Sequence, residues 1–128
     1  MRALLDTHAA LYAWIAPERL SDRAQQVIRN PANQLYFSQA SVFEITLKYK
    51  LGKLPLPEPP ELYLPSRIER FSLSYLPLTD ADIFGITQLP ESHKDPFDWL
   101  LLATARRLKV PIISKDRAFA DYPVKLIW

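Results

Sequence analysis

Residues 2–8, RALLDTH, give the first indication of the fold, because a short apolar run there stops on an aspartate, Asp6. The stretch VPIISKD at 110–116 repeats this arrangement and stops on Asp116. Short apolar runs bounded by polar residues are typical of buried strands. In an open parallel sheet the carboxyl ends of the strands share one edge, and ligands bind there. We therefore expect both carboxylates at the same edge of one sheet.

Expected strands and helices alternate along the 128 residues. We expect strands at 3–5, 34–38, 72–78, 111–114 and 124–128, and helices at 7–16, 20–30, 39–53, 79–89 and 95–109. Residues 61–71 form a further short helical candidate that Pro65 interrupts, and the proline-rich segment Pro55–Pro60 is expected to be a loop. This alternation predicts an α/β fold, a single three-layer α/β/α domain over residues 1–128 with a central parallel sheet.

Composition excludes several kinds of site. Cysteine is absent, so the chain has neither disulfides nor thiolate metal sites. Two glycines, Gly52 and Gly85, are too few for a Walker or dinucleotide-binding loop. No apolar run approaches the length of a membrane span, and the N-terminus lacks the pattern of a signal peptide. We therefore expect a cytoplasmic protein that makes no membrane contact.

Three further acids are expected near the same edge of the sheet. Glu44 lies in the second turn of the helix after strand 34–38, and Asp95 and Asp98 lie at the start of the helix before strand 111–114. Two like charges about 4 Å apart repel by roughly 4 kcal/mol at an effective dielectric constant of 20. Mg²⁺ or Mn²⁺, which prefer oxygen ligands, would relieve this repulsion and activate water against a phosphodiester.

Four of the five acids also have a purely structural explanation. Asp95 fits a helix N-cap, and Asp98 falls in the first turn, where the helix dipole favours negative charge. Glu44 and Lys48 have the i, i+4 spacing of an exposed ion pair. Asp6 is placed to cap the helix that follows it. Only the expected meeting of these acids at one edge favours a functional site.

Five segments of the chain resemble, in order, the conserved blocks of PIN-domain proteins. They are LLDTHAALYAW, FSQASVFEITLKYKLGKL, LPL, HKDPFDWLLLATA and IISKDRAFADYPVKLIW. The likeness is greatest to the VapC-type toxins of bacterial and archaeal toxin–antitoxin pairs. It runs from Leu4 to Trp128 and leaves only the proline-rich middle unmatched.

This resemblance implies a metal-dependent endoribonuclease whose acidic residues bind Mg²⁺ or Mn²⁺. Transferred position by position, the catalytic and metal-binding residues are Asp6, Glu44, Asp98 and Asp116. Asp95 resembles the capping acid of the same motif. Trp99 stands where many relatives have arginine, which would change contact with the substrate. The resemblance also implies a homodimer and a small antitoxin whose tail covers the acidic pocket.

The charge of the chain agrees with an RNA partner. Without the four candidate acids, 16 basic residues face 10 acidic ones, a net charge of +6. Several basic residues lie near the candidate site in sequence: Lys48, Lys50, Lys53, Lys94, Lys115 and Arg117. Such side chains would hold the phosphate backbone around a metal-loaded centre.

Other functions are compatible with parts of the pattern. A metal-free ribonuclease could use His8 and His93 as general acid and base. A haloacid-type phosphatase needs a second acid two residues after Asp6, where His8 stands. A phospho-acceptor domain needs paired acids after the first strand and an acceptor aspartate after a middle one, and both are missing. A non-catalytic binding module would have no reason to retain four acids that repel one another.

Overall fold

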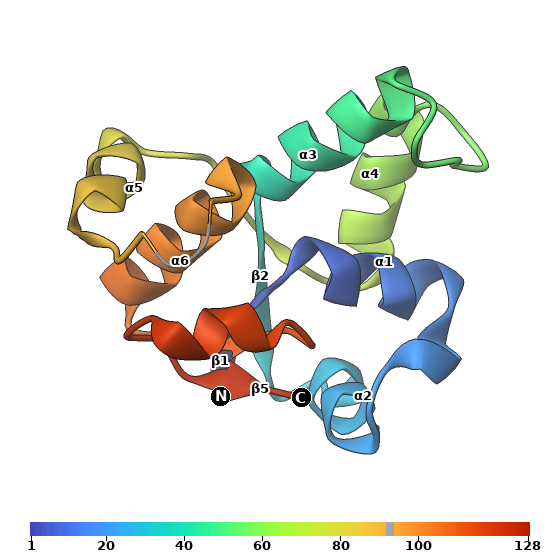
Figure 1. Ribbon diagram of the computed structural model, residues 1–128. Helices are drawn as coiled ribbons and strands as arrows, with labels where there is room; N and C mark the ends of the chain where they lie inside the picture. Colours follow the sequence, from blue (N-terminus) through green and yellow to red (C-terminus); the bar gives the residue numbers. More distant parts are fainter. Residues whose placement is uncertain (92–93) are drawn as a thin grey trace.

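A parallel sheet of five strands forms the centre of the computed structural model, which describes residues 1–91 and 94–128 (Figure 1). The strands are β1 (Arg2–Leu5), β2 (Gln34–Ser38), β3 (Ser74–Leu76), β4 (Ile112–Ile113) and β5 (Leu126–Ile127). Their order is β3-β2-β1-β4-β5, and all four neighbouring pairs are parallel. The predicted α/β class and parallel sheet are confirmed.

In the described residues, six α-helices connect the strands: α1 (Thr7–Ile15), α2 (Asp22–Arg29), α3 (Gln39–Lys50), α4 (Pro60–Arg70), α5 (Asp80–Gly85) and α6 (Pro96–Leu108). Ser21, Ser38, Thr79 and Asp95 cap α2, α3, α5 and α6 by accepting hydrogen bonds from backbone N–H groups. No helix in the described part of the chain combines the length and hydropathy needed to cross a membrane.

The helices cover both faces of the sheet, so the predicted three layers are present. Successive residues of β1 point to opposite faces: Leu5 packs in a core with α1, α2 and α4, and Leu4 packs in a core with α6 and the 3₁₀ helix η3 (Arg117–Asp121). Figure 1 shows α1, α2 and α4 on one side of β2 and α5 and α6 on the other. α3 contacts α1, α4 and α6, and therefore bridges the two layers.

Two expectations about helices were wrong. Pro65 does not interrupt the helical candidate, because α4 runs through it. Proline has no N–H to donate to the carbonyl of residue 61. Residue 61 is exposed, so water can bind this carbonyl, and burial of Tyr63 and Leu64 holds the helix on the sheet. The expected helix 79–89 divides into α5 and the 3₁₀ helix η2 (Ile86–Gln88), at a glycine followed by a β-branched residue.

Three expected strands are shorter than predicted, and two short helices were not foreseen. The expected strands 72–78, 111–114 and 124–128 contain only the three residues of β3, the two residues of β4 and the two residues of β5. The additional 3₁₀ helices are η1 (Pro17–Arg19) and η3. The latter begins directly after Asp116 and therefore belongs to the candidate site.

Candidate active site at the carboxyl edge of the sheet

Asp6 lies at the carboxyl end of the central strand. Its backbone N–H donates to the carbonyl of Ile113 on β4 at 3.0 Å, and the residue is only 3% exposed. Although Asp6 occupies the N-cap position of α1, its side chain makes no capping hydrogen bond. Ser114 Oγ instead donates to Asp6 Oδ2 at 2.9 Å. Helix capping therefore does not explain the carboxylate.

Ser114 connects the two strand-end aspartates. This buried residue follows β4, and its hydroxyl donates to Asp6 while accepting the backbone N–H of Asp116 at 3.0 Å. Sequence reasoning missed Ser114. The available signal was its position, since it is the first polar residue after the apolar strand and stands two residues before Asp116, where serine commonly closes a local turn.

Glu44 is buried on α3, close to the start of α1. A hydrogen bond of 2.8 Å between the hydroxyls of Thr7 and Ser41 joins the two helices. Ser41 and Glu44 are three residues apart and share a helix face. Glu44 is only 2% exposed; Lys48 Nζ contacts its Oε2 at 2.5 Å, whereas Oε1 is buried without a hydrogen-bond partner among the described residues. The expected Glu44–Lys48 pair exists, but it leaves one buried oxygen unsatisfied.

The pKa of Asp6 is set by opposing effects of its surroundings. Burial raises the pKa of Asp6, and the negative charge of Glu44 raises it further. Hydrogen bonds from Ser114 and the Thr7 backbone, and the charge of His8, oppose this rise without cancelling it. Glu44 is thus close enough to Asp6 for its charge to disfavour the ionised form of Asp6.

Asp116 faces the same cavity as Asp6. The cavity has a volume of about 310 Å³ and is lined by Asp6, His8, Tyr12, Lys115, Asp116 and Arg117. Asp116 is exposed, and its Oδ1 accepts the backbone N–H of Ala118 at 2.9 Å, which caps η3. The carboxylate therefore has a structural role as well as a place in the cavity.

The start of α6 lies beside α3. Asp95 caps α6 by accepting the N–H of Phe97 at 2.9 Å, which confirms its predicted role as a cap. The rings of Phe97 and Phe43 meet edge to face with centroids 5.3 Å apart. Their neighbours in sequence, Asp98 and Glu44, are both buried, with Asp98 9% exposed. Neither acid is among the residues that line the cavity of Asp6 and Asp116.

The acids at this edge supply the oxygen ligands that a divalent cation prefers, but they are not grouped tightly around one point. Within residues 1–91 and 94–128, no three His, Cys, Asp or Glu side chains are grouped closely enough to hold a metal ion. The structure brings Asp6 together with Asp116, and Asp6 within electrostatic reach of Glu44. Glu44 Oε1 has no hydrogen-bond partner in the described part of the chain, and the raised pKa of Asp6 shows that its negative charge is not fully compensated. Carboxylate oxygens in this state are the ligands that Mg²⁺ or Mn²⁺ prefers.

The sequence also singled out Trp99 and His93. Trp99, on α6, is partly buried against the core, and its Nε1 is buried without a hydrogen-bond partner among the described residues. Its expected effect on substrate contact stays a prediction. His93 lies outside the described residues.

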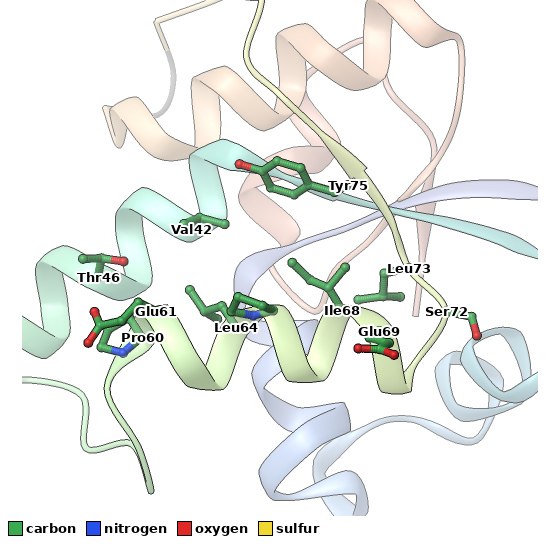
Figure 2. A pocket seen from close by; sticks show the side chains of 11 residues that line it. Val42, Thr46, Pro60, Glu61, Leu64, Ile68, Glu69, Ser72, Leu73 and Tyr75 are labelled. Carbon is green, nitrogen blue, oxygen red and sulfur yellow. The ribbon is translucent and has the colours of Figure 1, made fainter.

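A second cavity, of about 770 Å³, lies between α3, α4 and the edge strand β3 (Figure 2). Its lining is mainly apolar: Val42, Thr46, Pro60, Glu61, Leu64, Pro65, Ile68, Glu69, Ser72, Leu73 and Tyr75. We call it the α3–α4 groove. Glu61 and Glu69 are exposed, and Pro60 begins α4 at the end of the proline-rich loop.

Relatives with known structures share the whole fold. VapBC2 from Rickettsia felis, bound to a DNA fragment from its promoter, matches with a TM-score of 0.71 and 18% identity over 99% of this chain and 98% of that chain. A toxin–antitoxin complex from Klebsiella pneumoniae matches with a TM-score of 0.64 and 18% identity over 98% and 96% of the two chains. FitAcB from Neisseria gonorrhoeae matches with a TM-score of 0.63 and 18% identity over 100% and 97%. At this identity the likeness establishes the fold alone.

Sequence comparisons agree with the fold. Ribonuclease VapC16 from Mycobacterium tuberculosis (strain ATCC 25618 / H37Rv) is 37% identical over 60 residues, which cover 47% of this chain and 43% of that protein. The match thus spans less than half of that relative. The family model described as PIN domain matches residues 3–125, almost the entire chain. The chain therefore belongs to the PIN-domain family.

Proposed function

We propose that this protein is a metal-dependent endoribonuclease that acts in the cytoplasm as the toxin of a toxin–antitoxin pair. The observation that carries the proposal is the buried pair Asp6 and Glu44 at the carboxyl edge of a PIN-domain sheet: the charge of Glu44 raises the pKa of Asp6, and Glu44 Oε1 has no hydrogen-bond partner among the described residues. One relative is named a ribonuclease, and similar solved structures are toxin–antitoxin complexes. These names support the class of reaction and of partner.

Asp6, Glu44, Asp98 and Asp116 would hold Mg²⁺ or Mn²⁺. When bound, the ion would lower the pKa of a water ligand and stabilise charge on the phosphate oxygens. Ser114 fixes the orientation of Asp6 by donating to its Oδ2. Lys48 neutralises part of the charge of Glu44.

A metal-free reaction is the second candidate, because exposed His8 lines the same cavity as Asp6. An imidazole beside a bound phosphate could act as general acid or base near neutral pH. Both mechanisms require the cavity, but only one requires the carboxylates to bind an ion. Chelation therefore separates them.

The test is cleavage of a structured RNA by purified protein with Mg²⁺ or Mn²⁺ and then with EDTA. We expect cleavage to need the metal and to be lost in Asp6→Asn and Asp98→Asn. Asp22→Asn is the matched control for Asp98→Asn, since Asp22 is also a first-turn helix acid. Full activity in EDTA, together with loss in His8→Ala, would establish the metal-free mechanism instead. Full activity in folded Asp6→Asn would refute the carboxylate mechanism.

The antitoxin is proposed to dock in the α3–α4 groove. Figure 2 shows the side chains of Leu64 and Ile68 rising from α4, with Glu61 and Glu69 on the same helix. An apolar groove with acids along one wall complements an amphipathic helix that carries Lys or Arg beside its apolar face. We propose such a helix of the antitoxin as the ligand of the groove, because the two exposed carboxylates distinguish this groove from a purely apolar surface.

Charge reversal tests the docking proposal without disturbing the core. We expect Glu61→Lys/Glu69→Lys to weaken binding of the purified antitoxin several-fold, with the loss shrinking as salt rises. Glu18→Lys/Glu91→Lys, which changes two exposed acids outside the groove, should bind as the wild type does. Equal affinities of the two double variants at low salt would place the antitoxin elsewhere.

We further propose that the protein forms a homodimer, as the resemblance to VapC-type toxins implies. Light scattering after size exclusion should give twice the mass of the 14.8 kDa chain. A monomer at high concentration would contradict this.

A further inference from the structure

The cavity beside Asp6 and Asp116 has a second wall that metal binding does not explain. His8 and Tyr12 from α1 and Lys115 and Arg117 from the segment after β4 form this wall. We call these four residues the aromatic–basic wall. A volume of about 310 Å³ is at the small end of ligand pockets, which suits one small planar group rather than a peptide or a duplex.

The two rings of the wall are held in place by the fold. His8 and Tyr12 are four residues apart on α1 and share one face, with ring centroids 6.5 Å apart. Arg19 Cζ lies 5.2 Å from the Tyr12 ring centroid, and the ring of Trp128 lies 6.5 Å away. Tyr12 packs only partly against the core, so a positioned ring is left at the cavity.

The two basic residues of the wall carry charge that the described protein does not neutralise. Lys115 and Arg117 are exposed, and no described ion pair includes either of them. They stand on either side of Asp116 in sequence and line the cavity with it. Two cations next to an acidic centre suit a ligand that carries a phosphate a short distance from the group bound by the acids.

We propose that the aromatic–basic wall binds one unpaired nucleotide of the RNA substrate, next to the linkage that is cleaved. This inference rests on the proposed ribonuclease function. His8 and Tyr12 contact the base, and Lys115 and Arg117 contact its phosphate. A base stacked within a duplex has no free face for this contact, so the substrate must be single-stranded at this position. Ring contacts and phosphate contacts carry little sequence information, so the wall selects unpaired RNA rather than one particular base.

The test is fluorescence anisotropy in EDTA, which measures binding without metal-dependent cleavage. The probe is a short single-stranded RNA, compared with the same strand annealed to its complement. We expect tighter binding of the single strand. Tyr12→Leu should weaken it roughly fivefold to a hundredfold, the range for loss of one base-stacking ring, whereas Tyr12→Phe keeps the ring and should bind nearly as the wild type does. His8→Ala alters an exposed side chain and gives a second test that does not depend on packing.

A charge-matched pair of double variants tests the basic residues. Lys115→Gln/Arg117→Gln should lower the slope of log affinity against log salt by about 1.4, the value for losing two phosphate contacts to a single strand. Arg23→Gln/Arg70→Gln removes the same charge from exposed positions outside the cavity and should leave the slope nearly unchanged.

The outcomes separate this inference from the proposed function. If wild-type protein cleaves RNA but all wall variants bind as the controls do, or the duplex binds as tightly as the single strand, the nucleotide site is wrong and the ribonuclease stands. If wild-type protein does not cleave RNA with Mg²⁺ or Mn²⁺, the proposed function itself fails, and single-strand binding that depends on the wall would then show a nucleic-acid site without that activity.

Discussion

Two aspartates with nearly the same burial should respond in opposite ways to the same substitution. Asp82 on α5 is 1% exposed and Asp6 is 3% exposed. Each becomes an amide of the same size in Asp82→Asn and Asp6→Asn. We expect the first variant to lose about 2–3 kcal/mol of unfolding free energy at pH 7, and the second to lose less than about 1 kcal/mol or to gain stability.

The loss at Asp82 follows from its partners. Arg107 Nε and Nη2 donate to its two oxygens at 2.6 and 3.3 Å, and the Thr79 N–H donates to Oδ2 at 3.1 Å in a capping box. Burial alone would raise the pKa of Asp82, but these hydrogen bonds lower it. An amide has one acceptor oxygen and cannot satisfy both partners, and a hydrogen bond to a charged group contributes about 1.5–3 kcal/mol. Arg107 is partly exposed and can regain water, which keeps the loss below that of a fully buried pair.

Asp6 has the opposite balance. Burial raises the pKa of Asp6, and the charge of Glu44 raises it further. Ionisation of Asp6 at neutral pH therefore destabilises the folded state. An asparagine keeps an acceptor for Ser114 and removes the charge. In Asp6→Asn the weaker hydrogen bond to Ser114 lowers the unfolding free energy, and the absence of a buried charge raises it, so the two effects nearly cancel.

Urea unfolding followed by circular dichroism, in EDTA, measures both variants. The stability from Asp82, whose pKa is lowered by folding, is present above the unfolded-state pKa and is lost as pH falls through the folded value, so the deficit of Asp82→Asn should shrink on acidification. The stabilisation from Asp6, whose pKa is raised by folding, is present below the unfolded-state pKa and is lost as pH rises through the folded value. The unfolding free energy of Asp6→Asn relative to the wild type should therefore be highest at neutral pH. If Asp6→Asn costs as much at pH 7 as Asp82→Asn, the charge at Asp6 is already compensated and the reasoning is refuted.

Three further predictions concern the same site and its support. Mn²⁺ at ten times its dissociation constant should stabilise the wild type by about 1.4 kcal/mol in thermal unfolding, whereas Glu44→Gln should lose this shift and Asp22→Asn should keep it. Ser114→Ala, which releases Asp6, should lower cleavage at limiting metal more than at saturating metal; equal losses would contradict a positioning role. Gly52→Ala should cost about 1–2 kcal/mol in urea unfolding, because Gly52 has φ +71° and the added methyl meets no neighbour that could account for the loss.

Sheet topology made the position of the strand-end acids predictable. Apolar runs stopping at Asp6 and Asp116 were sufficient to place both acids at one edge, since parallel strands must end together. The capping role of Asp95 was also predictable, because an N-cap is a local interaction between residues two or three apart.

The remaining features depend on contacts between distant segments. The hydrogen bonds of Ser114 with Asp6 and of Thr7 with Ser41 link residues 108 and 34 positions apart, and no local pattern encodes them. Asp82 was not singled out in the sequence, and its partner Arg107 lies 25 residues away. A sequence therefore shows where acids occur, but not which of them a base has neutralised. That difference separates the structural acid of α5 from the candidate site.

The charge distribution limits what the carboxyl edge can bind. Nothing in the fold requires Asp6 to be ionised, since a buried polar group of the same size would keep the packing without the desolvation penalty. A ligand that supplies positive charge would compensate this penalty, so the acids alone point to a cation. Lys115 and Arg117 lie at the same cavity and would repel a cation that arrived alone, but they would attract a polyanion. A phosphate chain bound together with a divalent ion would match both the acids and the bases of this edge, and the proposed RNA substrate would be such a ligand.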